Sequence, residues 1–114
     1  MGKEFSSNVV VSSNTGIIGT GSVYGVMTVG LAAMEVKIGA EKLAGRKSVT
    51  LCAHPDNSGY IYLGLDNTVA VNKYMFVLPG GAGLNIELDS ADDLDIFVIG
   101  SAANQGLGVL EGIS

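Results

Sequence analysis

Apolar and polar residues alternate along much of the chain from Leu31 onward. Alternation with a period of two is typical of strands that bury one face and expose the other. The pattern predicts four such strands, whose inward residues are Met34, Val36 and Ile38, then Val49, Leu51 and Ala53, then Ile61, Leu63 and Leu65, then Leu84, Ile86 and Leu88. Two further runs, Met75–Leu78 and Leu94–Ile99, are apolar on both faces, which predicts central strands.

Turn-forming residues separate these runs at Pro55–Gly59, Asp66–Asn67 and Pro79–Gly83. Proline fixes φ and glycine permits a positive φ, so each segment has a physical reason to turn. Only Ala40–Gly45 has helical spacing, and it is long enough for a single turn. Short strands joined by short polar links predict an all-β fold, an antiparallel β-sandwich or a jelly roll.

Residues 1–30 differ in pattern from the rest of the chain, because small apolar residues and glycines follow one another there without a sustained period. We therefore expect two parts, an extended glycine-rich N-terminal arm at 1–30 and a β-sandwich domain at 31–114. One short strand is expected in the arm, at Val9–Val11. Apolar residues of an arm need cover from another surface, so they are candidates for an interface with a neighbouring subunit or another protein: Val9, Val10, Val11, Ile17, Ile18, Val23 and Tyr24.

Composition agrees with a β-rich domain and narrows the possible partners. The 114 residues are 47% hydrophobic and 15% charged and include 17 glycines, which argues against both a disordered chain and a helix bundle. The net charge is −5, and residues 74–114 contain no lysine or arginine. Only Arg46-Lys47 approaches a basic cluster, so nucleic acid is not an expected partner.

Signals for a membrane or an export route are missing from the sequence. The longest apolar stretch, Val23–Met34, is interrupted and too short to span a bilayer, so we expect a soluble protein without a membrane partner. Gly2 and Ser6 match the spacing for N-terminal myristoylation, but this short pattern often arises by chance. The lone Cys52 excludes an intrachain disulfide and a zinc site built from cysteines, and it fits a reducing compartment.

Glycine-rich segments offer weak candidates for a cofactor site. Gly19–Gly25 resembles a dinucleotide-binding loop, but Tyr24 stands where the third glycine belongs and no helix follows. Pro79–Gly83 lacks the lysine and hydroxyl residue of a phosphate-binding loop. We expect a flexible arm and a hairpin turn at these positions, and no cofactor.

Titratable residues offer little support for catalysis. His54, the only histidine, precedes a proline without a recognisable partner, so we expect a surface turn residue. Cys52 is expected to be packed and inert. The acidic residues Glu87, Asp89, Asp92, Asp93 and Asp95 lack the spacing and closing glutamate of a calcium loop, so a solvated turn is favoured; a cation or partner site at Asp92–Asp95 stays open. The sequence thus predicts no catalytic and no metal site, and a protein that is not an enzyme.

Four segments resemble a small β module of tailed-bacteriophage virion proteins. Leu43–Leu51 is similar to its "Leu-x-Gly-Arg-x-Ser-Leu-x-Ile" pattern, Gly59–Gly64 to an "Ile-Tyr-Val-Gly" strand, Phe76–Gly81 to a "Leu-x-Pro-Gly" turn, and Gly108–Glu111 to a terminal "Val-x-Val-Leu-Glu". The likeness extends from about Leu31 to Glu111 and leaves out the arm.

The resemblance implies a structural role in the virion. We expect a capsid decoration or cement protein that is made in the host cytoplasm and binds the major capsid protein on the outer surface of the head. A homo-oligomer is expected, with a trimer favoured. A tail or head-fibre module is the alternative, and a carbohydrate-binding sandwich with Tyr60 and Tyr62 as stacking platforms is a third interpretation.

Overall fold

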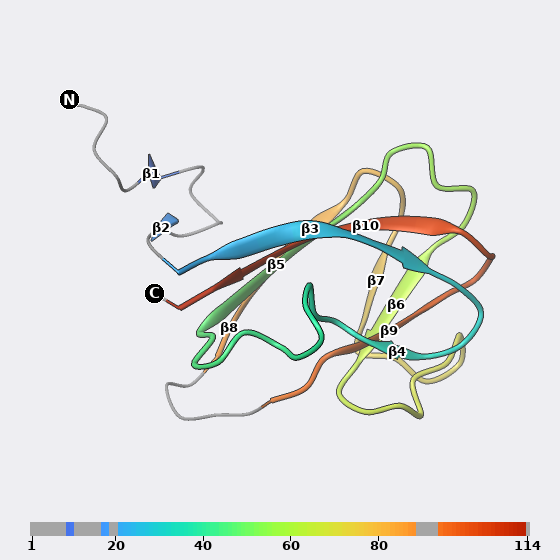
Figure 1. Ribbon diagram of the computed structural model, residues 1–114. Coiled ribbons are helices and arrows are strands. Elements are labelled where there is room, and N and C mark those ends of the chain that lie inside the picture. The colour runs from blue at the N-terminus through green and yellow to red at the C-terminus, as the bar shows by residue number, and fades with distance from the viewer. Residues whose placement is uncertain (1–8, 11–16, 19–20, 89–93, 114) are drawn as a thin grey trace.

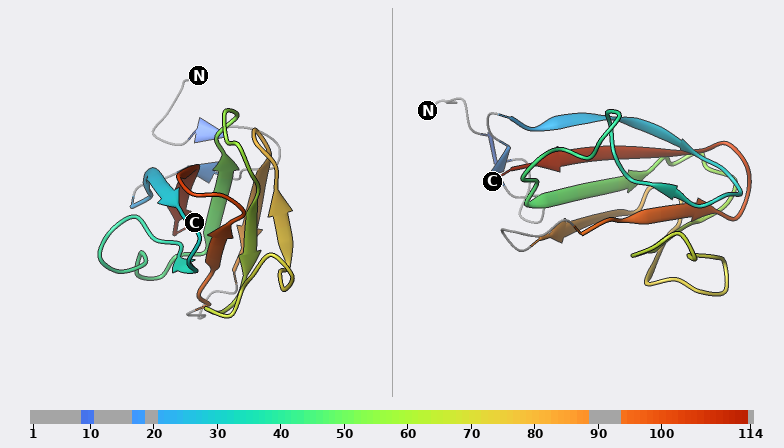
Figure 2. Two further views of the ribbon diagram at one scale, coloured as in Figure 1. Left: turned by 90° about the vertical axis from the view of Figure 1, so that its right-hand side faces the viewer. Right: turned by 60° about the horizontal axis from the view of Figure 1, so that its bottom comes forward.

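Two four-stranded antiparallel sheets pack face to face in the computed structural model of the chain, which describes residues 9–10, 17–18, 21–88 and 94–113 (Figures 1 and 2). The first sheet has the order β3 (Val23–Val29), β10 (Gln105–Gly112), β5 (Ser48–Ala53) and β8 (Gly83–Glu87). The second has the order β4 (Met34–Glu35), β9 (Phe97–Gly100), β6 (Ile61–Gly64) and β7 (Phe76–Leu78). A separate pair joins β1 (Val9–Val10) to β2 (Ile17–Ile18).

The described residues contain strands and turns and no helix, so the predicted all-β sandwich is confirmed. One consequence is that the helical turn expected at Ala40–Gly45 is wrong. The chain bends there and turns at Ala44–Gly45, where Gly45 has a φ of 70°. No helix in the described part of the chain is long and apolar enough to cross a membrane.

The inward side chains of both sheets meet in one core. Alternation placed Val49, Leu51 and Ala53 correctly, because all three are buried on the inner face of β5. Leu65 is wrongly placed by the same pattern and is exposed, since β6 ends at Gly64 and the chain turns away. The core cluster consists of Met27, Val29, Val36, Val49, Leu51, Ala53, Ile61, Leu63, Leu78, Ile96, Val98, Leu107 and Val109.

The two runs that are apolar on both faces occupy different positions in the second sheet. Leu94–Ile99 contributes β9, which lies between β4 and β6 and is central, as expected. Met75–Leu78 contributes β7, which is an edge strand, so that prediction is wrong. β7 pairs with β6 alone among the described strands, and only Leu78 of this run is buried.

The predicted boundary at residue 30 does not hold for β3, which belongs to the first sheet. All seven residues of β3 pair with β10, from Val23 opposite Glu111 to Val29 opposite Gln105. Met27 and Val29 are part of the core. The alternation of β3 is hard to detect in the sequence because one of its inward positions, Gly25, has no side chain. Ile38 fills the space that a side chain at Gly25 would need.

The predicted turns lie where proline and glycine placed them. The carbonyl of His54 accepts a hydrogen bond from the Asn57 amide at 3.0 Å, and that of Pro79 accepts one from Ala82 at 3.0 Å. Gly81 has a φ of 84°, a conformation that glycine adopts without strain.

Some residues singled out in the sequence lie outside the described part of the chain. They are Gly2, Ser6, Val11, Gly19, Asp89, Asp92 and Asp93.

Candidate interaction surfaces

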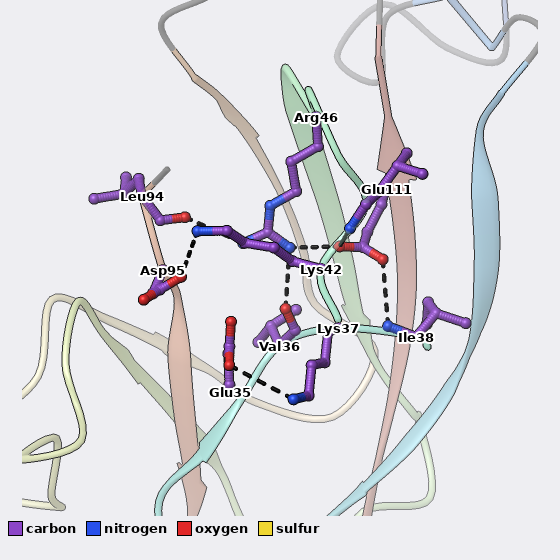
Figure 3. Close-up of polar contacts among 10 residues, drawn as sticks. Glu35, Val36, Lys37, Ile38, Lys42, Arg46, Leu94, Asp95 and Glu111 are labelled. Atoms are coloured by element: carbon purple, nitrogen blue, oxygen red, sulfur yellow. Dashed lines mark hydrogen bonds and ion pairs between the residues drawn. The ribbon is translucent and has the colours of Figure 1, made fainter. Parts of the chain in front are cut away.

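A buried ion pair lies where the segment after β4 crosses between the sheets (Figure 3). Arg46 is 3% exposed and Glu111 is fully buried, and their Nη1 and Oε2 atoms are 2.5 Å apart. Burial of a charge without a partner is strongly unfavourable, so the two side chains require each other. Arg46 therefore adds nothing to a basic surface.

Backbone groups extend this network, in which Arg46 Nε alone has no hydrogen-bond partner among the described residues. The Glu111 carboxylate accepts hydrogen bonds from the amides of Ile38 and Leu43, both at 3.2 Å. The Arg46 guanidinium donates to the carbonyls of Val36 at 3.0 Å and Leu94 at 3.2 Å. The network joins three distant segments of the chain and is closed to solvent, so its role is to hold the fold together.

Lys42 and Asp95 form a second ion pair beside the network. Lys42 Nζ donates to Asp95 Oδ1 at 2.6 Å, and this hydrogen bond lowers the pKa of Asp95 below its ordinary value. Of the five acidic residues considered for a cation site, Asp95 thus interacts with a cation of the chain itself. The exposed Glu87 ends β8, and the other three lie outside the described residues.

His54 is an exposed turn residue, as expected. Its Nδ1 accepts a hydrogen bond from the Asp56 amide at 3.0 Å, which fixes the ring against its own turn. Among the described residues, no three histidine, cysteine or acidic side chains are grouped in a way that could hold a metal ion.

Cys52 does not have the packed environment that we expected. The thiol is exposed on the outer face of β5. Its neighbours on the two adjacent strands are Gly108 of β10 and Gly83 of β8. The prediction is wrong because alternation gives only the direction of the Cys52 side chain. It does not show that both cross-strand neighbours are glycines, which have no side chain to cover the thiol.

The outer face of the first sheet is uncharged along two neighbouring rows, and its large apolar side chains lie on β3 and β10. Cross-strand pairing places Tyr24, Leu110, Thr50 and Asn85 in one row and Val26, Gly108, Cys52 and Gly83 in the next. Together these eight residues define the β3 face. Tyr24 is 82% exposed and Val26 is 79% exposed. Because Gly108 has no side chain, a shallow hollow of about 360 Å³ lies between them and Cys52.

The second sheet has an aromatic outer surface. The rings of Tyr62 and Tyr74 lie 4.9 Å apart at an angle of 50°. Tyr74 and Val77 are 51% and 40% exposed, and Tyr60 is exposed just before β6. These four residues define the tyrosine face. Both outer surfaces of the sandwich therefore present large apolar side chains to solvent.

The seven interface candidates fall into three groups. Tyr24 lies on the β3 face, whereas Val23 lies on the opposite face of the strand together with the buried Met27 and is partly buried. Val9, Val10, Ile17 and Ile18 form the backbone pairs of β1 and β2, and Val11 is not described. Sequence reasoning missed Val26, Cys52 and Leu110. The spacing of Val26, two residues after Tyr24, was the signal that could have found it.

A scan against known protein families, a search of curated proteins and a search of solved structures each gave no match for this chain. A functional proposal therefore rests on the surfaces of the chain itself and on the resemblance of its motifs.

Proposed function

We propose that this chain is a structural protein of a tailed-phage virion, a decoration or cement protein without catalytic activity. It docks through the β3 face onto the major capsid protein at the outer surface of the assembled head. The observation that carries the proposal is the exposure of Tyr24 and Val26 beside an uncharged hollow. Large apolar patches on small soluble domains mark sites of interaction.

The energetics of the β3 face support a docking role. Burial of one exposed large apolar side chain contributes about 1.5–3 kcal/mol. The two rows of the β3 face contain no charged residue, and the centres of protein interfaces are depleted in charge in the same way. Docking of this face therefore gains apolar burial without desolvating a charge.

Binding of this kind stabilises a shell by mass action. A ligand that binds only the assembled state stabilises it by RT ln(1 + [L]/Kd) at each site, which is about 2.7 kcal/mol at a hundredfold excess over Kd. A small domain repeated over many sites thus reinforces a head without any chemistry of its own.

Purified heads that lack the protein provide the test. We expect the chain to co-sediment with expanded heads in a saturable manner and to raise their melting temperature in scanning calorimetry. Tyr24→Ser should weaken binding at least about tenfold, which corresponds to the roughly 1.4 kcal/mol lost with part of one buried ring. Val77→Ser, on the tyrosine face, is the matched control and should bind normally. Absence of co-sedimentation by the native chain would refute the proposal.

A tail or head-fibre module would use the same surfaces at a different place on the particle. Gold-labelled antibody against the chain, viewed on intact virions by electron microscopy, separates the two. Label distributed over the head supports decoration, and label confined to the tail or to fibres supports the alternative.

Carbohydrate binding is a second candidate because of the tyrosine face. The paired rings of Tyr62 and Tyr74, with Tyr60 nearby in sequence, offer flat apolar surfaces of the kind on which sugar rings stack. A glycan array tests this candidate directly. Binding that is lost in Tyr74→Ala and kept in Tyr24→Ser would favour it over docking through the β3 face.

A further inference from the structure

The free edge of β3 is the feature of the molecule that the proposed function leaves unexplained. β3 is an outermost strand of the first sheet and has β10 on one side only (Figure 1). No described strand pairs with its other side. An exposed edge is a template for another strand, and natural sheets usually protect it by short length, proline, charge or a bulge.

The other three edge strands of the two four-stranded sheets show such protection, and β3 does not. β4 has two residues, β7 has three and is followed by Pro79, and β8 ends in the exposed Glu87. β3 has seven residues and contains neither proline nor charge.

The backbone groups on the free edge of β3 can be assigned. In an antiparallel ladder each residue directs its N–H and C=O to one neighbour, and the direction alternates along the strand. The carbonyl of Gly106 accepts a hydrogen bond from the His54 amide on the β5 side, so Leu107 and Val109 are directed towards β3. Their partners are Met27 and Gly25.

It follows that Tyr24, Val26 and Thr28 direct their N–H and C=O groups away from β10. Their side chains lie on the exposed face of the strand. Three successive donor and acceptor sites thus stand along the free edge beside two of the most exposed apolar side chains of the sandwich.

We propose that β3 pairs with β3 of a second copy of this chain, antiparallel about a two-fold axis at Val26. Tyr24 then lies opposite Thr28 of the other copy and Val26 lies opposite its equivalent, each pair exchanging two hydrogen bonds. Two-fold pairing brings equivalent residues of the two copies near one another. Like charges would repel at an edge that contains a residue such as Glu87, whereas β3 contains no charged residue. The pairing joins two four-stranded sheets into one.

The size of this contact sets the expected affinity. An aromatic side chain covers about 150–250 Å², so two Tyr24 rings, two Val26 side chains and the paired backbones remain below the roughly 1,200–2,000 Å² of a standard interface. Contacts of that size belong to weak assemblies, so a dissociation constant in the micromolar range is expected. The pairing predicts a dimer in place of the trimer expected from the sequence, and it does not depend on docking to a capsid.

Amide hydrogen exchange of the full chain, followed by NMR below and above the dissociation constant, tests the pairing. The amides of Tyr24, Val26 and Thr28 should exchange at least about tenfold more slowly at the higher concentration, whereas those of Gly25 and Met27 should be protected at both. Sedimentation should show twice the mass of the 11.6 kDa chain at the higher concentration. A monomer at all concentrations, a trimer, or unchanged exchange at the three amides would overturn the proposal.

Val26→Pro provides an independent arm of the experiment. It removes one N–H from the free edge and none from the ladder with β10, and edge strands tolerate proline at such positions. We expect a folded monomer, with Val77→Pro on the edge strand β7 as the matched control that still dimerises. A folded Val26→Pro chain that dimerises like the native protein would contradict the pairing. Thr28→Pro removes another N–H of the free edge and lies outside the β3 face. Loss of dimers in Thr28→Pro with normal binding to heads would leave the proposed function intact.

Discussion

Arg46 and Glu111 illustrate how two single residues hold distant parts of the sandwich together. They are 65 positions apart in the sequence and share a hydrogen bond of 2.5 Å in the interior. Glu111 also accepts two backbone amides, while Arg46 donates to two carbonyls. The two residues are not equivalent, because loss of the carboxylate leaves two amides without an acceptor, whereas loss of the guanidinium leaves two carbonyls without one donor. A buried N–H without an acceptor is less well tolerated than a carbonyl that has lost a donor.

We therefore expect Glu111→Leu to be more destabilising than Arg46→Met. Breaking a buried ion pair lowers the free energy of unfolding by about 3–5 kcal/mol, and each amide left without an acceptor adds about 1–3 kcal/mol. Urea unfolding followed by circular dichroism measures the difference. Lys37→Met, at the half-exposed pair with Glu35, is the control and should change stability by less than about 1 kcal/mol. Equal effects of the two buried substitutions would contradict the unequal roles.

Asp95 yields a prediction about pH at the same scale. The hydrogen bond from Lys42 is the main cause that lowers its pKa. A lowered pKa in the folded state stabilises the protein above the unfolded pKa of about 3.9, and this contribution is lost as the pH falls through the folded value. In Lys42→Met, NMR titration should show the pKa of Asp95 rising towards 3.9. An unchanged pKa would mean that Lys42 is not the cause.

At the scale of elements, β3 decides where the folded domain begins. It supplies one edge of the first sheet and two core residues, Met27 and Val29. Composition indicated a boundary between the arm and the sandwich at residue 30. The structure instead places β3, and so residues 23–29, within the sandwich.

Two truncations test the position of β3. Removal of residues 1–20 keeps every strand of both four-stranded sheets, so we expect a folded domain with preserved circular dichroism. Removal of residues 1–29 exposes the edge of β10 and opens the core at Met27 and Val29, and the chain should be unfolded or aggregate. A stable, soluble product of the longer truncation would show that β3 is dispensable.

A close approach between β9 and the following loop gives a second prediction for an element. A Cβ at Gly100 would lie 2.7 Å from the carbonyl oxygen of Ala102 and 3.2 Å from that of Gly30. We expect Gly100→Ala to destabilise the protein by about 1–3 kcal/mol, because the neighbouring atoms belong to the backbone. Gly30→Ala is the matched control, since nothing lies within 4 Å of its added Cβ. Thermal unfolding measures the stability of both variants. A loss in Gly100→Ala alone indicates steric crowding, whereas equal losses in both variants indicate the backbone freedom of glycine.

At the scale of the whole molecule, both outer surfaces of the sandwich expose large apolar side chains. A domain of this size with one solvated face per sheet normally places polar residues there. Here the β3 face and the tyrosine face expose Tyr24, Val26, Tyr74 and Val77. A sandwich with an exposed apolar patch on each outer surface is suited to lie between partners.

Cys52 provides a probe of this arrangement. Its exposed thiol lies on the β3 face, so we expect it to react readily with a maleimide in dilute solution. The proposed docking on heads implies that the reaction slows at least about tenfold in their presence, because a docked β3 face would exclude the reagent. Cysteine placed at Val77 in a Cys52→Ser background is the control and should remain reactive. Equal labelling of Cys52 in free and bound protein would place the contact elsewhere.

The sequence by itself determined the fold class, most of the inward positions and the turns. Alternation at Val49, Leu51 and Ala53, and the proline and glycine at Pro79 and Gly81, act through local geometry that does not depend on distant residues. It also identified Tyr24 as an interface candidate, from its apolar and glycine-rich surroundings.

Only the tertiary structure decided which strands lie at the edges and which residues meet. The apolar run at β7 and the alternation at Cys52 describe each strand alone and say nothing about the neighbouring strand. The central position predicted for β7 and the covered thiol predicted for Cys52 are therefore both wrong. Contacts such as Arg46 with Glu111 depend on the path of the whole chain. The free edge of β3 and the hollow beside Gly108 arise in the same way, because each is defined by strands that are distant in sequence.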